Sequence, residues 1–194
     1  IRFHGNPVLT LKETKLRGAH NAENLMAALG VGYTRGLPFD AMRKPLCEYR
    51  AMPHRCEFIR TIDGVDWIND SKGTNPDAVE KALLGEVRPV VLIAGGKDKG
   101  FEFGPLSVIV GAKCRCAVTL GEIANHIEET WRNALPIFNA GRSLETAVEL
   151  ARAHANQGDV VLFSPGTSSF DMFKNYAERG NKFRELVLTM TPKQ

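Results

Sequence analysis

Mostly apolar runs alternate with amphipathic stretches along the chain from about residue 55 onwards. The runs are continuous, as in strands buried on both faces, and cover 89–94, 116–120 and 159–164. Between and around them, apolar residues recur at helical spacing in 76–84, 105–112, 123–132 and 143–158. Strands that alternate with helices form parallel sheets through right-handed crossovers. The pattern therefore predicts a three-layer α/β domain with a mostly parallel sheet.

A hairpin opens this domain. Residues 56–62 alternate apolar and polar side chains, and the Asp63-Gly64 pair that follows is typical of a two-residue hairpin turn. We therefore expect 65–69 to return antiparallel, which leaves one antiparallel strand at the edge of the sheet. A short strand at 136–138 and a closing helix at about 181–188 complete the prediction.

The first fifty residues have a different, mainly helical pattern. Short β-like pieces at 2–3 and 8–11 precede two predicted helices, 21–35 and 40–50. An exposed connector with the sequence Ala-Met-Pro-His-Arg follows at 51–55. We place a domain boundary in this connector, which divides the chain into residues 1–51 and 52–194.

Three polar loops follow predicted parallel strands, at 70–75, 95–100 and 164–171. Loops at the carboxyl ends of such strands share one edge of the sheet, where open α/β proteins bind ligands. The loops contain cationic and hydroxyl side chains, namely Lys72, Thr74, Lys97, Lys99, Thr167, Ser168 and Ser169. Such groups suit a small anion, a carboxylate or a phosphate. The first loop alone also fits an ordinary turn with a solvated lysine, capped by Asn75 with Pro76 at the first helical position.

Charge, apolar runs, cysteines and histidines exclude several classes of protein. The chain has 194 residues and a net charge of +3, without a basic cluster, so we expect no nucleic-acid partner. No apolar run approaches a membrane span, and the first residues lack the features of a signal peptide or an initiator Met, as in a chain cut from a longer one. The four cysteines form no C-x-x-C pair, which favours a reducing, cytoplasmic setting. The histidines show no metal-ligand spacing, and we expect no metal ligands in this chain.

Several motifs of other enzyme classes do not occur. No G-x-G-x-x-G follows a strand, and no G-x-x-x-x-G-K-[ST] is present, although Gly95-Gly96-Lys97 resembles a fragment of one. The chain also lacks the G-x-S-x-G elbow that exposes a serine nucleophile. These absences argue against the usual dinucleotide-binding, P-loop and hydrolase sites within these residues.

A series of longer motifs is more specific than any single loop. In order, they are Gly18-Ala19-His20-Asn21 with Asn24, Met52-Pro53-His54-Arg55, Asn69-Asp70-Ser71-Lys72-Gly73-Thr74-Asn75, Gly95-Gly96-Lys97-Asp98-Lys99, Leu162-Phe163-Ser164-Pro165 and Ser168 to Tyr176 through Arg179-Gly180-Asn181-Lys182-Phe183. Together they resemble the Mur ligase family, over nearly the whole chain from Gly18. The D-S-K-x-T-N and S-x-D-x-F-K-N-[FY]-x-x-R-G-x-x-F patterns are most similar to members that add D-glutamate.

The resemblance implies a fold and a reaction. Residues 1–51 would be the C-terminal tail of the central, ATP-binding domain, and 52–194 the Rossmann-like last domain, with helices on both faces of its sheet. The implied enzyme is an ATP-dependent acid–amino-acid ligase of peptidoglycan precursor synthesis. It makes an acyl phosphate from UDP-N-acetylmuramoyl-L-alanine, which the D-glutamate amine attacks. A monomer that works with ATP and Mg²⁺ is expected.

The resemblance also implies residue roles. Asn24 would contact adenine, Asp70 the ribose and Arg55 the nucleotide phosphates. Thr74 and Lys99 would hold the side-chain carboxylate of D-glutamate, and Ser169 with the backbone at Tyr176 its α-carboxylate. Lys72 would lie between nucleotide and amino acid, as a substrate-binding and catalytic residue.

Departures from the family pattern limit what these residues can do. Gly73 and Tyr176 stand where Ala and Phe are usual. The P-loop, the magnesium ligands and the carbamylated lysine of the family are not in these 194 residues, so we expect the chain alone to be inactive. The alternatives are another Mur ligase, a folylpolyglutamate synthase-like ligase, or a non-catalytic nucleotide- or amino-acid-binding module.

Overall fold

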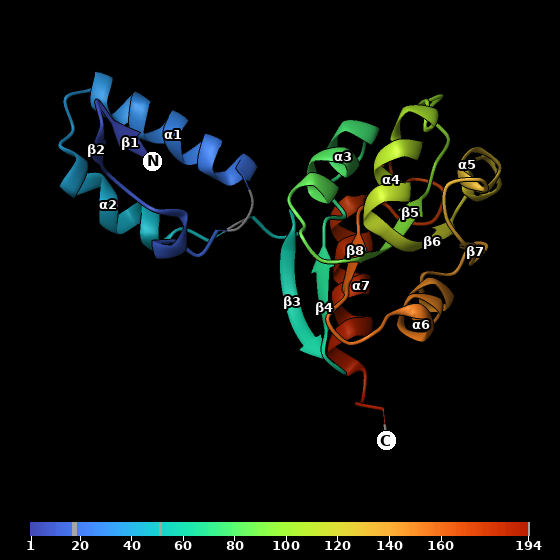
Figure 1. Cartoon of the computed structure of the whole chain (residues 1–194). Helices are drawn as coiled ribbons and strands as arrows, with labels where there is room; N and C mark the ends of the chain where they lie inside the picture. Colours follow the sequence, from blue (N-terminus) through green and yellow to red (C-terminus); the bar gives the residue numbers. More distant parts are fainter. Residues whose placement is uncertain (17–18, 51, 194) are drawn as a thin grey trace. The chain divides into compact units, whose positions relative to one another are not determined.

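The computed structural model describes residues 1–16, 19–50 and 52–193. The chain divides into two compact units, Ile1–Met52 and Pro53–Gln194, each with its own core (Figure 1). Ala51, where we ended the first predicted domain, and Gly18, where the family motifs begin, lie outside the described residues. None of the helices in the described part combines the length and apolar composition that a membrane crossing requires.

The first unit is small and mainly helical. It contains the antiparallel pair β1 (Arg2–Phe3) and β2 (Asn6–Pro7), the 3₁₀ helix η1 (Leu11–Glu13), and the helices α1 (Ala19–Thr34) and α2 (Phe39–Glu48). Leu9, Leu16 and Leu25 are its buried cluster. The two predicted helices are confirmed, whereas the predicted strand piece at 8–11 is wrong. The capping box between Thr10 and Glu13 starts η1 there instead.

A six-stranded sheet forms the centre of the second unit, in the order β3-β4-β8-β5-β6-β7. The first pair is antiparallel and every other pair is parallel, as the sequence predicts. Asn69 on β4 pairs with Phe163 on β8, which pairs with Ile93 on β5, so these strands end at one level. The strands are β3 (Glu57–Ile62), β4 (Val65–Asn69), β5 (Val90–Gly95), β6 (Cys114–Leu120), β7 (Ile137–Asn139) and β8 (Val160–Phe163).

Helices cover both faces of this sheet, so the three-layer prediction is confirmed (Figure 1). One face packs against α3 (Pro76–Leu84), α4 (Ser107–Lys113) with the 3₁₀ helix η2 (Gly104–Leu106), and α5 (Ala124–Trp131). The other face packs against α6 (Leu144–His154) and α7 (Tyr176–Thr189). Val91, Ile93, Val161 and Phe163 are fully buried, as continuous apolar strands require.

Two local features fix the first hairpin of the sheet and the start of the last helix. Asp63 and Gly64 have φ of 55° and 73°, the left-handed pair of a type I′ turn, which confirms the predicted hairpin. Helix α7 begins at Tyr176, five residues before the predicted start, because Asn175 caps it through Glu178 N. The earlier start brings its first turn to the polar loops.

Candidate functional site

The three predicted polar loops lie together at the carboxyl edge of the sheet, because β8 lies between β4 and β5. Backbone hydrogen bonds join them. Gly166 N donates to Gly73 O at 2.9 Å, which connects the loop after β8 to the loop after β4. Lys97 N donates to Ser168 O at 2.9 Å, which connects it to the loop after β5. The loops are therefore one connected surface rather than three separate turns.

Gly96 allows this close approach. Its φ is 142°, a value that L side chains rarely adopt, and an added Cβ would lie 2.5 Å from Ser168 O. A side chain here would push apart the loops that Lys97 N and Ser168 O join. The glycine-rich start of this loop thus has a packing reason that does not depend on a phosphate ligand.

The first turn of α7 faces the loop after β4. Ser71 Oγ donates to Tyr176 O at 2.8 Å, and Lys72 Nζ lies 5.9 Å from the centre of the Tyr176 ring. The first N–H groups of a helix have no partner within the helix, and its positive dipole end favours anions. A lysine and a helix start therefore come from different parts of the chain to the same place.

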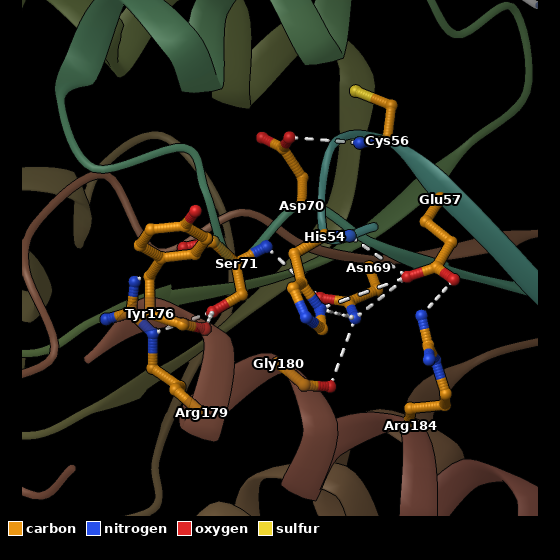
Figure 2. Close-up of polar contacts among 10 residues, drawn as sticks. All are labelled: His54, Cys56, Glu57, Asn69, Asp70, Ser71, Tyr176, Arg179, Gly180 and Arg184. Atoms are coloured by element: carbon orange, nitrogen blue, oxygen red, sulfur yellow. Dashed lines mark hydrogen bonds and ion pairs between the residues drawn. The ribbon is translucent and has the colours of Figure 1, made fainter. Parts of the chain in front are cut away.

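Arg179 braces two loops from beneath and is only 1% exposed. Its Nε donates to Ser71 Oγ at 3.0 Å and its Nη2 donates to Ser71 O at 2.9 Å (Figure 2). Its Nη2 also donates to Thr167 O at 3.1 Å. Burial lowers the pKa of Arg179 to about 10, which leaves the guanidinium charged at neutral pH. Arg179 Nη1 and Ser168 Oγ are buried without a hydrogen-bond partner among the described residues.

Asp70 is turned into the protein and is 4% exposed. Its Oδ1 accepts from Cys56 N at 3.1 Å and its Oδ2 from Ser164 Oγ at 2.7 Å. Burial raises the pKa of the Asp70 carboxyl to about 6, and the bonds from Ser164 and Cys56 oppose that rise. Carboxylate oxygens accept more than one hydrogen bond each, so Asp70 retains acceptor capacity for a hydroxyl group.

A second polar cluster holds the segment before β3 against α7 (Figure 2). Asn69 Nδ2 donates to Gly180 O at 3.1 Å and to His54 Nδ1 at 2.9 Å. His54 Nδ1 is then an acceptor, so the neutral ring carries its proton on Nε2. Burial lowers the pKa of His54, in agreement with a neutral ring. Glu57 accepts from His54 N at 3.0 Å and pairs with Arg184, which completes the cluster.

The residues predicted to hold the amino acid lie in the joined loops or at the start of α7. Thr74 and Lys72 are half-buried, Ser169 is buried, and Tyr176 is the first residue of α7. Lys72 N donates to His54 O at 2.9 Å, which ties the loop to the segment before β3. Lys99 is exposed in the loop after β5, beside a pocket lined also by Phe101, Phe103, Ile123, His126 and Thr167.

The residues predicted to hold the nucleotide are more scattered. Arg55 is exposed and directly follows the buried His54, while Asp70 is buried beside Cys56. Asn24 belongs to the first unit, where it is exposed on α1 and its Nδ2 lies 3.4 Å from Asn21 Oδ1. The structure therefore brings together two of the three within one unit.

The sequence-based prediction did not identify three buried residues that organise the site, Arg179, Asn69 and His54. All three lie in motifs that carry the family resemblance, but the contacts of Arg179 with Ser71 and of Asn69 with Gly180 each span more than 100 positions. One signal was available: Asn175 followed by Glu178 is a helix start, which places Arg179 in the first turn. Within the described residues, no group of three His, Cys, Asp or Glu side chains could hold a metal ion.

The family model "Mur ligase, glutamate ligase domain" matches residues 54–167, more than half of the chain. The chain belongs to the Mur ligase family. The match includes the loops after β4 and β5 and the start of the loop after β8, and it ends before Ser169 and α7.

Curated relatives share more of this Mur ligase chain. It is 44% identical over 191 residues to the UDP-N-acetylmuramoylalanine–D-glutamate ligase of Pseudomonas fluorescens, covering 96% of the chain and 42% of the relative. The enzyme of that name from Marinobacter nauticus is 47% identical over 183 residues, covering 93% of the chain and 41% of the relative. The chain thus spans about two fifths of the length of the curated relatives it matches.

Solved structures confirm the fold of this Mur ligase chain at low sequence identity. UDP-N-acetylmuramate-alanine ligase from Thermotoga maritima superposes with a TM-score of 0.65 at 16% identity, covering 91% of the chain and 39% of that structure. Folylpolyglutamate synthase from the same organism gives 0.61 at 16% identity, covering 93% of the chain and 41% of that structure. At these identities the likeness concerns the fold alone.

Proposed function

We propose that this Mur ligase chain is the D-glutamate-binding part of an ATP-dependent ligase that joins D-glutamate to UDP-N-acetylmuramoyl-L-alanine in peptidoglycan precursor synthesis. The observation that carries the proposal is the connected loop surface at the carboxyl edge, which offers lysines, hydroxyls and a helix start. Such a surface suits a dicarboxylate. Relatives at 44% and 47% identity that are named for D-glutamate support this choice of amino acid.

The proposed roles divide the surface between two ligands. Thr74 and Lys99 bind the side-chain carboxylate of D-glutamate, and Ser169 with the N–H of Tyr176 binds the α-carboxylate. Lys72 lies between amino acid and nucleotide in this proposal. Binding both carboxylates of D-glutamate would hold its amine in one orientation. Such orientation of the reactants lowers the barrier of a bimolecular reaction substantially.

ATP fits the nucleotide side of this arrangement. Within the second unit, Arg55 is an exposed cation suited to phosphates, and Asp70 retains acceptor capacity for a ribose hydroxyl. Asn24, which the family resemblance assigns to adenine, has an exposed side chain in the first unit. ATP would supply the phosphoryl group that activates the carboxylate of the first substrate. The magnesium that accompanies it would be held mainly by residues outside this chain, in the same enzyme's other domains.

Binding of D-glutamate to the purified chain tests the proposal. We expect saturable chemical-shift changes at the backbone amides of Thr74, Lys99, Ser169 and Tyr176 in two-dimensional NMR spectra, and much weaker changes with L-glutamate. Ser169→Ala should weaken D-glutamate about tenfold by removing one charge-assisted hydrogen bond. Lys81→Gln, an exposed change on α3, is the matched control and should leave the affinity unchanged. Equal responses to both enantiomers, or unaltered affinity in Ser169→Ala, would contradict the proposal.

The complete reaction mixture gives a second readout. With ATP, Mg²⁺, D-glutamate and UDP-N-acetylmuramoyl-L-alanine, the 194-residue chain should release no phosphate, because it contains no P-loop sequence. Robust ATP-dependent amide formation by the chain alone would contradict this prediction and show that these residues also activate the carboxylate.

A further inference from the structure

A fourth loop, residues 121–123 between β6 and α5, reaches the surface that the three polar loops form. Glu122 N donates to Asp171 Oδ2 in the loop after β8 at 3.0 Å. Ile123 N donates to Gly96 O in the loop after β5 at 3.1 Å. The loop after β6 is therefore part of the same connected surface, and it places the side chain of Glu122 beside the loop that contains Lys99.

The Glu122 carboxylate holds the two residues that precede Lys99. Lys97 Nζ lies 2.7 Å from Glu122 Oε2, and Asp98 N donates to the same oxygen at 3.4 Å. The hydrogen bonds from Lys97 and Asp98 lower the pKa of the Glu122 carboxyl, so it is ionised at neutral pH. Gly100 N donates to Asp98 Oδ1 at 2.8 Å, which closes the turn around Lys99. The start of this turn is thus tied to a residue of another loop.

The pairing also decides which lysine of the loop is available to a ligand. Lys97 is paired with Glu122, whereas Lys99 is exposed and forms no ion pair within the described part of the chain. The side chains of Lys97 and Glu122 are 44% and 34% exposed, and an ion pair so close to solvent adds little to the stability of the fold. Its effect should therefore be on the direction of the turn rather than on folding.

We propose that Glu122 is a positioning residue for the amino-acid site, which holds Lys97 and Asp98 N so that the loop presents Lys99 to the side-chain carboxylate of the ligand. This inference rests on the proposed D-glutamate function and adds to it a residue from outside the three predicted loops. Glu122 acts through Lys99 and need not contact the amino acid. A turn that is held in advance loses less conformational entropy when the ligand binds, which strengthens binding without a new contact.

The D-glutamate affinity of two Glu122 variants tests the proposal. Glu122→Ala and Glu122→Gln both remove the charge, but Glu122→Gln keeps an oxygen that can accept from Lys97 Nζ and Asp98 N. In NMR titrations of the purified chain, Glu122→Ala should weaken D-glutamate about fivefold, because the turn must then be ordered on binding. Glu122→Gln should stay close to the parent chain. Glu129→Ala, which removes an exposed glutamate from α5, is the matched control and should leave the affinity unchanged.

A double-mutant cycle shows whether Glu122 acts through Lys99. Lys99→Met alone should weaken D-glutamate about tenfold, the value of one hydrogen bond to an anion. In the Lys99→Met background, Glu122→Ala should have no further effect, since no cation remains for it to position. A second loss in that background, of the size seen in the parent chain, would overturn the proposal, because Glu122 would then act elsewhere in the site.

Backbone motion in the ligand-free chain separates this inference from the proposed function. Nitrogen-15 relaxation should show larger fast motion at Asp98 and Lys99 in Glu122→Ala than in the parent or in Glu122→Gln, with Thr74 unchanged as an internal reference. If D-glutamate does not bind the parent chain, the proposed function fails, and this motion alone decides whether Glu122 fixes the turn. Unchanged motion in Glu122→Ala, or equal D-glutamate affinities of Glu122→Ala and Glu122→Gln, would overturn the inference. Far-UV circular dichroism of each variant verifies that the fold is intact.

Discussion

The two edges of the sheet are held together in different ways. At the carboxyl edge, the loops are tied to one another by buried polar groups, with the fully buried Arg179 donating to two of them. At the amino edge, a two-residue turn joins β3 to β4, and the ion pair of Arg88 with Asp66 lies near solvent, with Arg88 36% exposed. The comparison teaches that the loops of the candidate site are joined by a buried arginine, whereas Arg88 and Arg115 at the amino edge pair with aspartates from positions near solvent.

The largest difference should appear when an arginine is removed from each edge. Arg179→Met leaves three buried acceptor contacts unmade and should lower the free energy of unfolding by about 4 kcal/mol. Arg88→Met removes a partly exposed pair and should cost less than about 1 kcal/mol. Urea unfolding followed by tryptophan fluorescence measures both, since both tryptophans belong to the second unit. Equal losses in the two variants would break the comparison.

Two glycines with positive φ, one at each edge of the sheet, test the same comparison. Gly96→Ala should cost about 3 kcal/mol, because the new Cβ meets Ser168 O in addition to backbone strain. Gly158, before β8, has φ of 92° but open space around its Cβ position. Gly158→Ala should therefore cost only about 1 kcal/mol, the strain alone. The same unfolding experiment applies. A Gly96→Ala protein no less stable than Gly158→Ala would show that the loops can move apart freely.

Two buried aspartates should respond to pH with opposite signs. The folded-state pKa of Asp70 is raised to about 6, so the folded protein binds this proton more tightly than the unfolded chain does. Stability from this group is present at low pH and is lost as pH rises through 6. From pH 4 to pH 7, Asp70→Asn should therefore gain about 2 kcal/mol relative to the parent chain.

Asp159, directly before β8, is the matched case for the pH experiment. Burial raises its pKa, but the bonds from Arg115 and Asn156 N lower it by more, and the net shift is downward. Its contribution is present above the unfolded pKa and is lost as pH falls through the folded one. Asp159→Asn should thus lose stability relative to the parent as pH rises from acid to neutral. Unfolding at several pH values measures both slopes, and slopes of one sign would contradict the contrast.

Much of the fold could be predicted because its signals are local. Helix α3 begins at Pro76 and ends at Leu84, as predicted, since Asn75 and Pro76 mark its start. The hairpin between β3 and β4 could be predicted from its turn residues, Asp63 and Gly64. By contrast, the position of β8 between β4 and β5 depends on packing among distant strands, which periodicity does not encode.

The candidate site divides in the same way. The three loops could be predicted because each follows an apolar strand, and their common edge follows from parallel topology. The inward turn of Asp70 could not be predicted, because it depends on Ser164, 94 residues away. The bracing role of Arg179 was missed for the same reason, since an isolated arginine in a sequence usually indicates a solvated side chain.

The central place of β8 affects how the protein is made. Strands β4 and β5 leave the ribosome early, but each keeps an open edge until residues 160–163 have been synthesised, because β8 is the strand that joins them. Until then, the nascent chain exposes two apolar strand edges, the kind of surface that chaperones protect and that aggregates when left uncovered. The six-stranded sheet is therefore incomplete until its last strand in the sequence has been made.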